Sequence, residues 1–322
     1  MIQKIDISHK TVIFIAIFIL GLWATFLIRD LLIILFVSVI LVSTLNPWVH
    51  FLHKFKLPRA LSIGLTYIII IAVVTGFILT ITQPLIEESS NLIITFPVMA
   101  NQLFDALNID KSLLQSEITS ISKNIFSLTL SVFDNILTII FLLVITFYLL
   151  LERDNVEKRI SLLFVGREEK TRKLMIKIEE KLGAWLRGQL FLSLIIGLLS
   201  YIGLLAFNIP YALPLALLAG VMEIIPVIGP IVSAIPAILI ALNISPILAL
   251  GVAVMYFVIQ QLENHLIVPQ VMKRAVGLNP LIVILAIAIG SRILGFAGAL
   301  LAVPLTVVIQ IITAEIISEK KI

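Results

Sequence analysis

Cysteine is absent from the chain, and charged residues are scarce. Without cysteine among the 322 residues, disulfides, thiolate catalysis and cysteine-ligated metal centres are excluded. Only 13% of the residues are charged and 60% are hydrophobic, whereas a soluble domain has about 25% charged residues. So few charges cannot cover the surface of a soluble monomer of this length. The composition therefore disfavours a soluble enzyme, excludes a disordered chain, and predicts a polytopic membrane protein.

The basic residues indicate how the chain is oriented in a lipid bilayer. The net charge is +4, but the basic residues stand in short clusters beside apolar runs. This pattern orients membrane helices, so nucleic acid is not an expected partner. Basic clusters occur at residues 54–59 and 152–188, whereas residues 83–134 carry more acidic than basic residues. The positive-inside rule therefore places residues 83–134 outside and both termini in the cytoplasm.

Long apolar runs divide the chain into five parts. The expected fold is an all-α polytopic membrane protein with about eight membrane segments. The second apolar run is expected to end before Asn46 and Pro47. The predicted parts are transmembrane helices one to three in 1–82, an extracytoplasmic insertion of small helices in 83–134, transmembrane helix four in 135–151, a charged cytoplasmic helix in 152–188, and a transport core in 189–322.

Proline and glycine interrupt two apolar segments of the C-terminal third in a similar order. The segments are Pro214–Leu239 and Pro280–Val308. Proline breaks the hydrogen-bond ladder of a helix, and lipid cannot satisfy the backbone groups that this leaves free. The breaks must therefore face protein or water. The charged loops favour a path into the membrane and back for each segment, so we predict two re-entrant helical hairpins that line a polar site.

Three ionisable residues lie within or at the edge of these apolar segments. They are Glu223, Glu263 and Arg292. A charge at the centre of a membrane helix costs at least about 2.5–3.5 kcal/mol, so each is a candidate functional residue. An ion pair between Glu223 and Arg292 would bridge the two hairpin tips. The structural alternatives are that Glu263 marks the membrane surface and that Arg292 extends to it. His265 faces another side of a helix than Glu263, so no metal site is expected.

Four motifs occur together in the C-terminal third. They are Glu223-Ile-Ile-Pro-Val-Ile-Gly-Pro230, Gln261-Leu-Glu-Asn264 followed by Pro269, Gly277-Leu-Asn-Pro280-Leu, and Gly295-Phe-Ala-Gly298 with Ala302-Val-Pro304-Leu. Together they resemble the autoinducer-2 exporter family of bacterial permeases, and the resemblance covers nearly the whole chain. Asn279 departs from the family pattern, in which histidine more often precedes the proline, and this weakens the case for a proton relay there. With Asn279 and Arg292, the matching positions are the candidates for transport and gating: Glu223, Pro226, Gly229, Pro230, Glu263, Asn264, Pro269, Gly277, Pro280, Gly298 and Pro304.

The resemblance implies a multi-pass transporter of the bacterial plasma membrane and a homo-oligomer, for which it suggests a pentamer. Members are associated with export of autoinducer-2 and with sodium–proton antiport. The chain has no Walker A motif, so direct use of ATP is not expected, nor is any cofactor. We predict ion-coupled transport of a small polar solute or signalling molecule by alternating access. A sodium(lithium)/proton antiporter is one alternative, and a passive channel or an oligomeric scaffold is another.

An intramembrane enzyme is disfavoured. The sequence contains no HExxH motif, and no aspartate lies within a predicted span as an intramembrane aspartyl protease would require.

Overall fold

The computed structural model describes residues 9–106, 136–226, 228–272 and 277–319, and every regular element in these ranges is a helix. Within them, five helices are long and apolar enough to cross a membrane, and four shorter apolar helices accompany them. The predicted all-α polytopic fold is therefore confirmed. In chain order the helices are α1 (His9–Leu27), α2 (Arg29–His53), α3 (Arg59–Ala106), α5 (Ile136–Leu151), α6 (Arg153–Leu162), α7 (Glu168–Ala206), α8 (Ala212–Met222), α9 (Ile228–Ile244), α10 (Pro246–Leu262), the π-helix η2 (Glu263–Ile267), α11 (Val268–Val271) and α12 (Pro280–Glu319).

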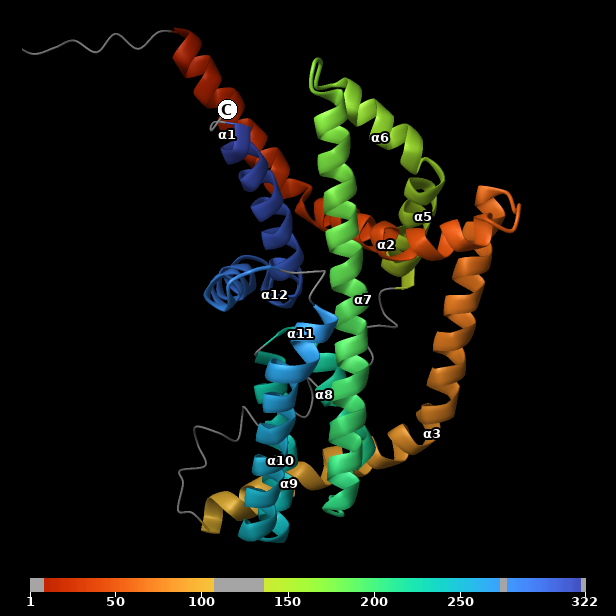
Figure 1. The fold of residues 1–322 in the computed structure, drawn as a ribbon. Helices are drawn as coiled ribbons and strands as arrows, with labels where there is room; N and C mark the ends of the chain where they lie inside the picture. Colours follow the sequence, from red (N-terminus) through yellow and green to blue (C-terminus); the bar gives the residue numbers. More distant parts are fainter. Residues whose placement is uncertain (1–8, 107–135, 227, 273–276, 320–322) are drawn as a thin grey trace, which may run out of the picture.

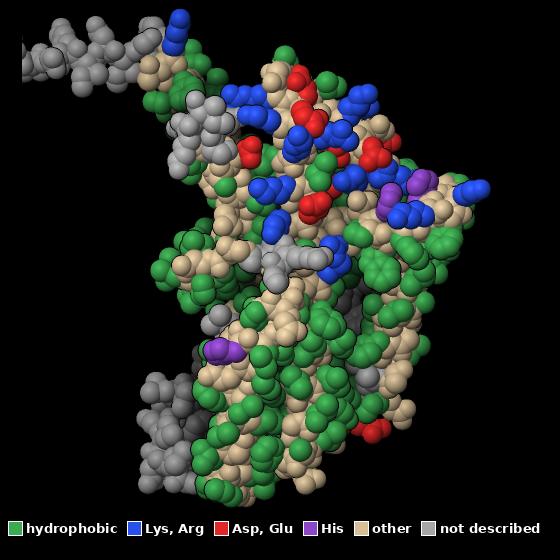
Figure 2. Space-filling view, viewed as in Figure 1, with side chains coloured by type: hydrophobic (Ala, Val, Ile, Leu, Met, Phe, Trp, Pro, Cys, Tyr) green, Lys and Arg blue, Asp and Glu red, His purple; other side chains and the backbone are tan. Residues whose placement is uncertain are grey.

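Helix α7 is the central element of the fold (Figure 1). It packs against α2, α8, α10 and α12 and carries α6 at its N-terminal end. The side chains of α7 to α10 share an apolar core that includes Leu204, Leu215, Ile240 and Val252. Figure 2 shows charged side chains over the end where α6 meets α7, and hydrophobic side chains over most of the opposite end. One end of α7 is therefore exposed to water, and the other is built for lipid.

Helix α2 continues through Pro47 to His53 and does not end where the sequence predicts. Proline has no backbone N–H, so the Ser43 carbonyl loses its usual donor four residues later. Arg187 of α7 takes the place of that donor. Its Nη1 donates to the Ser43 oxygen at 3.2 Å and to the Thr44 oxygen at 3.1 Å. A contact from α7 therefore satisfies the backbone where the proline interrupts α2.

Helix α3 extends for 48 residues, far beyond Thr82, where the third span was predicted to end. Its second part crosses the lower part of the molecule in Figure 1 and packs against α8 and α9. There the Glu88 Oε2 accepts a hydrogen bond of 3.2 Å from the backbone N–H of Leu213 in the first turn of α8. That N–H has no partner within its own helix. The first part of the predicted 83–134 insertion thus continues α3, while residues 107–135 lie outside the described ranges.

Ion pairs fasten the charged end of the molecule. The Arg153 guanidinium of α6 binds the Glu179 carboxylate of α7 at 2.7 Å. Arg59, the first residue of α3, pairs with Asp154 of α6. These contacts join α3, α6 and α7 within the part of the chain predicted to lie in the cytoplasm.

We expect Asp154 to stabilise this junction only while its carboxyl is ionised. Burial favours the neutral form, but the hydrogen bond and charge of Arg59, followed by those of Arg153, outweigh it and lower the pKa of Asp154. A group with a lowered folded-state pKa stabilises the fold above its unfolded pKa, and this contribution is lost as pH falls through the folded pKa. Because the side chain is 67% exposed, we expect a contribution of only about 0.2–1 kcal/mol at neutral pH.

Thermal unfolding of the detergent-solubilised protein tests this prediction. Asp154→Asn should lower the melting temperature at pH 7, and the difference from wild type should shrink as the pH falls below the unfolded-state pKa of about 3.9. Glu180→Gln, which removes an exposed acid elsewhere on α7, serves as the control. A difference that stays the same across this pH range would contradict the prediction.

Candidate functional site

The first predicted hairpin forms between α8 and α9. Helix α8 ends at Met222, α9 begins at Ile228, and the two helices pack against each other. Gly229 lies directly against the end of α8, because a Cβ atom there would stand 1.9 Å from the Met222 carbonyl oxygen. Pro230 is buried beside it. The Gly-Pro pair that interrupts the sequence therefore permits the close approach of the two limbs.

The second predicted hairpin lies within α12. The chain turns at Gly295, whose φ of 60° and ψ of −138° are not helical. On either side of the turn the backbone comes together, since a Cβ on Gly298 would lie 1.9 Å from the Gly290 oxygen. Pro304 is buried within the second limb. Both proline- and glycine-broken segments are thus folded back on themselves, as predicted.

Apolar side chains join the two hairpins. Ile225, in the break between α8 and α9, packs with Ile287 on the first limb of α12 and with Ala299 and Ala302 on the second. The first hairpin tip therefore rests in the angle between the limbs of α12. The contact contains no charge.

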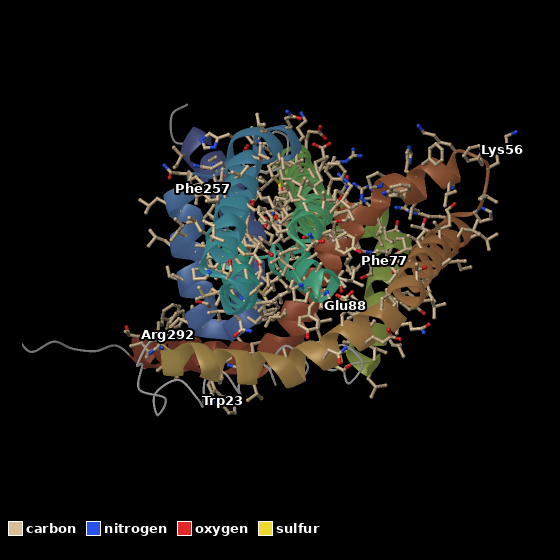
Figure 3. The ribbon with its side chains drawn as sticks, turned by 90° about the horizontal axis from the view of Figure 1, so that it is seen from below. Trp23, Lys56, Phe77, Glu88, Phe257 and Arg292 are labelled. Carbon is tan, nitrogen blue, oxygen red and sulfur yellow. The ribbon has the colours of Figure 1, made fainter. Side chains whose placement is uncertain are left out.

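The ion pair predicted between Glu223 and Arg292 does not form. Arg292 is exposed and lies at the edge of the molecule in Figure 3, whereas Glu223 is 1% exposed. Arg292 lies just before the Gly295 turn, and the apolar contact of Ile225 occupies the junction of the two hairpins. The partner of Glu223 comes from a different element.

That partner is Glu263, which is 5% exposed. The two carboxyl groups lie within hydrogen-bonding reach of each other. Gln260 Nε2 donates to Glu263 Oε2 at 3.0 Å, and Gln189 Nε2 of α7 donates to the Glu223 backbone oxygen at 2.5 Å. Glu223 Oε2 has no hydrogen-bond partner in the described protein. Side chains from α7 and α10 thus surround the break between α8 and α9.

A local widening of the helix coincides with Glu263. Residues Glu263–Ile267 form a π-helix between α10 and α11, and Pro269 follows in α11. Pro269 cannot donate to the carbonyl four residues earlier, so the regular ladder is interrupted there. Single π-turns of this kind are frequent at functional sites. Glu263 is therefore buried against the hairpin and does not mark the membrane surface.

The acidic pair has no cation beside it in the described structure. Neither Glu223 nor Glu263 forms an ion pair with a described residue. Two carboxylates in contact repel each other, and burial strengthens the repulsion. The arrangement is stable when a proton or a cation is shared between them. Nowhere in the described ranges do three His, Asp or Glu side chains gather in a metal-binding group.

A cavity of about 340 Å³ opens beside Glu263, between α7, α9 and α10. Its polar side chains are Ser233, Tyr256, Gln260 and Glu263, and the rest of its lining is apolar. The volume is at the lower end of the range of about 300–1,000 Å³ for small-molecule sites. The cavity therefore suits a small solute with few polar groups.

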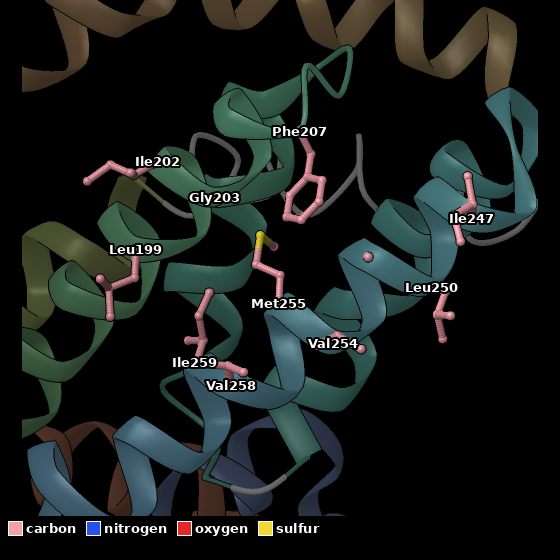
Figure 4. A pocket seen from close by; sticks show the side chains of 11 residues that line it. Leu199, Ile202, Gly203, Phe207, Ile247, Leu250, Val254, Met255, Val258 and Ile259 are labelled. Atoms are coloured by element: carbon pink, nitrogen blue, oxygen red, sulfur yellow. The ribbon is translucent and has the colours of Figure 1, made fainter.

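A larger hollow of about 660 Å³ lies between α7 and α10 (Figure 4). Met255 lies against Gly203 there, and Phe207 against Gly251. None of the residues that line it carries a charged or hydrogen-bonding side chain. This hollow offers nothing to a polar solute, so the cavity beside Glu263 is the candidate site.

The remaining sequence candidates lie outside this site. Asn279 has a structural contact, since its Oδ1 accepts a hydrogen bond of 2.9 Å from the Leu281 N–H in the first turn of α12. This contact is typical of a helix N-cap. Gly298 and Pro304 belong to the α12 hairpin, and Pro226 lies in the break of the first hairpin. The other candidates are exposed: Asn264, Pro269, Gly277, Pro280 and Arg292.

Sequence reasoning missed the polar residues that α7 and α10 contribute. Gln189 and Ser200 are buried on α7, and Tyr256 is buried on α10. Tyr256, Gln260 and Glu263 follow one another at spacings of four and three, which places them on one face of a helix. That spacing was the available signal.

A helical membrane protein with two proline- and glycine-broken hairpins beside a buried polar site has an organisation that is found in membrane transporters. Comparison with known proteins agrees with this class. Residues 12–318 match the AI-2E family transporter profile, and the chain belongs to this family.

Curated relatives match the chain over most of their length. These relatives include YrrI and YueF of Bacillus subtilis strain 168, which are provisionally named transport proteins. YrrI is 28% identical over 90% of this chain and 88% of its own. YueF is 30% identical over 84% of this chain and 80% of its own. The AI-2 transport protein TqsA of Escherichia coli K12 is 27% identical over 86% of this chain and 82% of its own. The chain is thus a multi-pass membrane protein of a transporter family.

Proposed function

We propose that the protein moves a small polar solute across the bacterial plasma membrane by alternating access, coupled to protons or another cation at Glu223 and Glu263. The name of the relative TqsA makes AI-2 the first solute to test. The observation that carries the proposal is the buried contact of two carboxyl groups without a cationic partner in the described structure. A bound cation or proton would neutralise this contact.

The first hairpin supplies the moving part of the proposed cycle. Glu223 stands at its tip, and Gln189 of α7 holds the Glu223 backbone oxygen. When a cation leaves the pair, repulsion between the carboxylates favours their separation. Separation would move α8 and α9 away from η2. The cavity beside Glu263 would then open to the other side of the membrane. The apolar contact of Ile225 with α12 allows such sliding, because it contains no hydrogen bond that must break.

The proposal includes an orientation and an assembly. Both termini lie in the cytoplasm, together with the ion-paired α6–α7 end, in accord with the distribution of basic residues. The proposed assembly is a homo-oligomer, as the resemblance to the AI-2E family implies.

Reconstitution into liposomes tests the coupling. Enclosed AI-2 should leave faster when the outer medium is made acidic, and a pH-sensitive dye should report acidification of the lumen. A protonophore should remove the acceleration. Repeating the assay with a sodium gradient tests cation–proton antiport at the same carboxyl pair.

Two results would overturn the proposal. One is AI-2 efflux that is indifferent to both the proton and the sodium gradient. The other is large unitary currents in a planar bilayer, which would assign the protein to the passive channels.

A further inference from the structure

The cavity beside Glu263 contains polar atoms that the protein leaves unused. Tyr256, which is 9% exposed, lines the cavity, and its hydroxyl has no hydrogen-bond partner among the described residues. The hydroxyl of Ser200 on α7 lies close to it, but the two hydroxyls do not form a hydrogen bond of regular geometry. Leaving a buried polar group without a partner is unfavourable, so a ligand that supplies a partner would be favoured.

The apolar part of the cavity restricts what that ligand can be. Ile196, Ala234 and Ile238 are among the aliphatic side chains that complete the lining. They suit a short alkyl body and leave a strongly hydrated molecule without partners. Ser233 already donates its hydroxyl to the Pro230 oxygen at 3.0 Å and retains only acceptor capacity.

The charges at the cavity wall determine which sign of charge a ligand can carry. Glu263 faces the cavity and Glu223 lies behind it, while Gln260 and Tyr256 are neutral. No described lysine, arginine or histidine lines the cavity. An anion would meet only carboxylate and dipoles, whereas a cation would meet carboxylate and the ring of Tyr256, which can add cation–π attraction.

We propose that this cavity binds a small alkylammonium ion, with its charge at Glu263 and Tyr256 and its alkyl groups against the α7, α9 and α10 side chains. The proposal rests on the proposed function in one respect, the assignment of the Glu223–Glu263 pair to the transport site. It adds a class of ligand. The ammonium occupies the place of the cation that the acidic pair shares, so its binding competes with that of a proton.

Calorimetric titration of the purified full-length protein with choline tests the proposal. Choline cannot lose a proton, and 3,3-dimethyl-1-butanol is its uncharged isostere. We expect choline to bind at least about tenfold more tightly than the isostere, because only choline gains the electrostatic attraction. Titration in two buffers of different ionisation enthalpy should show that choline releases protons from the protein.

Variants locate the binding. Glu263→Gln should weaken choline binding by about tenfold or more and abolish proton release, and Tyr256→Leu should weaken binding by about tenfold. Glu180→Gln, on the exposed charged end of α7, should bind like wild type. Melting temperatures identify variants that are simply unfolded, and Glu263→Asp, which keeps the charge, should retain part of the affinity.

Three outcomes would overturn the inference: no choline binding, equal binding of the uncharged isostere, or unchanged binding by Glu263→Gln. The inference and the proposed function can fail separately. Proton-coupled AI-2 flux without choline binding would remove only the ammonium site. Choline binding without any coupled flux would remove the transport proposal and leave the site.

Discussion

Glu223→Gln should abolish gradient-driven transport in a protein that still folds. Glutamine has nearly the same shape as glutamate but cannot be charged, so the pair with Glu263 can no longer exchange a proton or cation. We expect flux driven by a proton gradient to fall by at least about tenfold. The coupling proton can drive the change between the two conformations of the transporter only if it binds one of them more tightly, and the variant loses this difference. The substitution also removes a buried repulsion, so the melting temperature should be unchanged or higher.

Paired measurements of flux and melting temperature check this result. Glu263→Gln should give the same loss, and the double variant should be no worse than either single variant, since the two carboxyl groups act together. Glu180→Gln should transport like wild type. Wild-type flux in Glu223→Gln liposomes would remove the acidic pair from the mechanism.

Gly229→Ala should destabilise the protein strongly. The added methyl group would stand 1.9 Å from the Met222 carbonyl oxygen and 2.4 Å from the Met222 carbonyl carbon. Both are backbone atoms, which cannot rotate away, so the α8–α9 hairpin must open. Forcing extra volume into a packed core usually costs about 1–3 kcal/mol and occasionally more, and we expect the upper end of that range. The opening also displaces Glu223, so transport should fall as well.

Gly76→Ala is the matched control, because the space around Gly76 in α3 is open. In a helix interior this change normally stabilises by about 0.5–1 kcal/mol. The melting temperature should therefore move in opposite directions in the two variants. Equal melting temperatures for Gly229→Ala and wild type would show that the hairpin tip is not closely packed.

The hairpins could be predicted from sequence because proline and glycine have local effects. Pro226 lies in the break between α8 and α9, and Pro230 lies in the first turn of α9, where proline is tolerated. Other prolines were misleading. Pro47 and Pro84 lie within α2 and α3, and for Pro47 the compensating donor is Arg187, 140 positions away. Local rules cannot reveal a partner at that distance.

The partner of Glu223 could not be predicted for a related reason. Opposite charge made Arg292 the natural choice, whereas the structure places Glu263 there. The burial of Glu263 depends on the π-turn before Pro269 and on the packing of α10 against α9. A neighbour of like charge is unfavourable in isolation, so charge complementarity alone never selects it. Such conflicts with local rules are expected at functional sites.

The length and stiffness of helix α7 have a mechanical consequence. Its 39 residues form one uninterrupted rod of about 58 Å. Near one end, Glu179 is fastened to α6 by Arg153; nearer the middle, Arg187 holds α2 and Gln189 holds the tip of the first hairpin. A stiff rod turns as a whole and does not bend at one point. A change of ionic strength or a bound molecule could apply a torque to the charged end of α7. The whole helix would then tilt, and its contact at Gln189 would move the hairpin tip that carries Glu223, without any direct contact with the acidic pair.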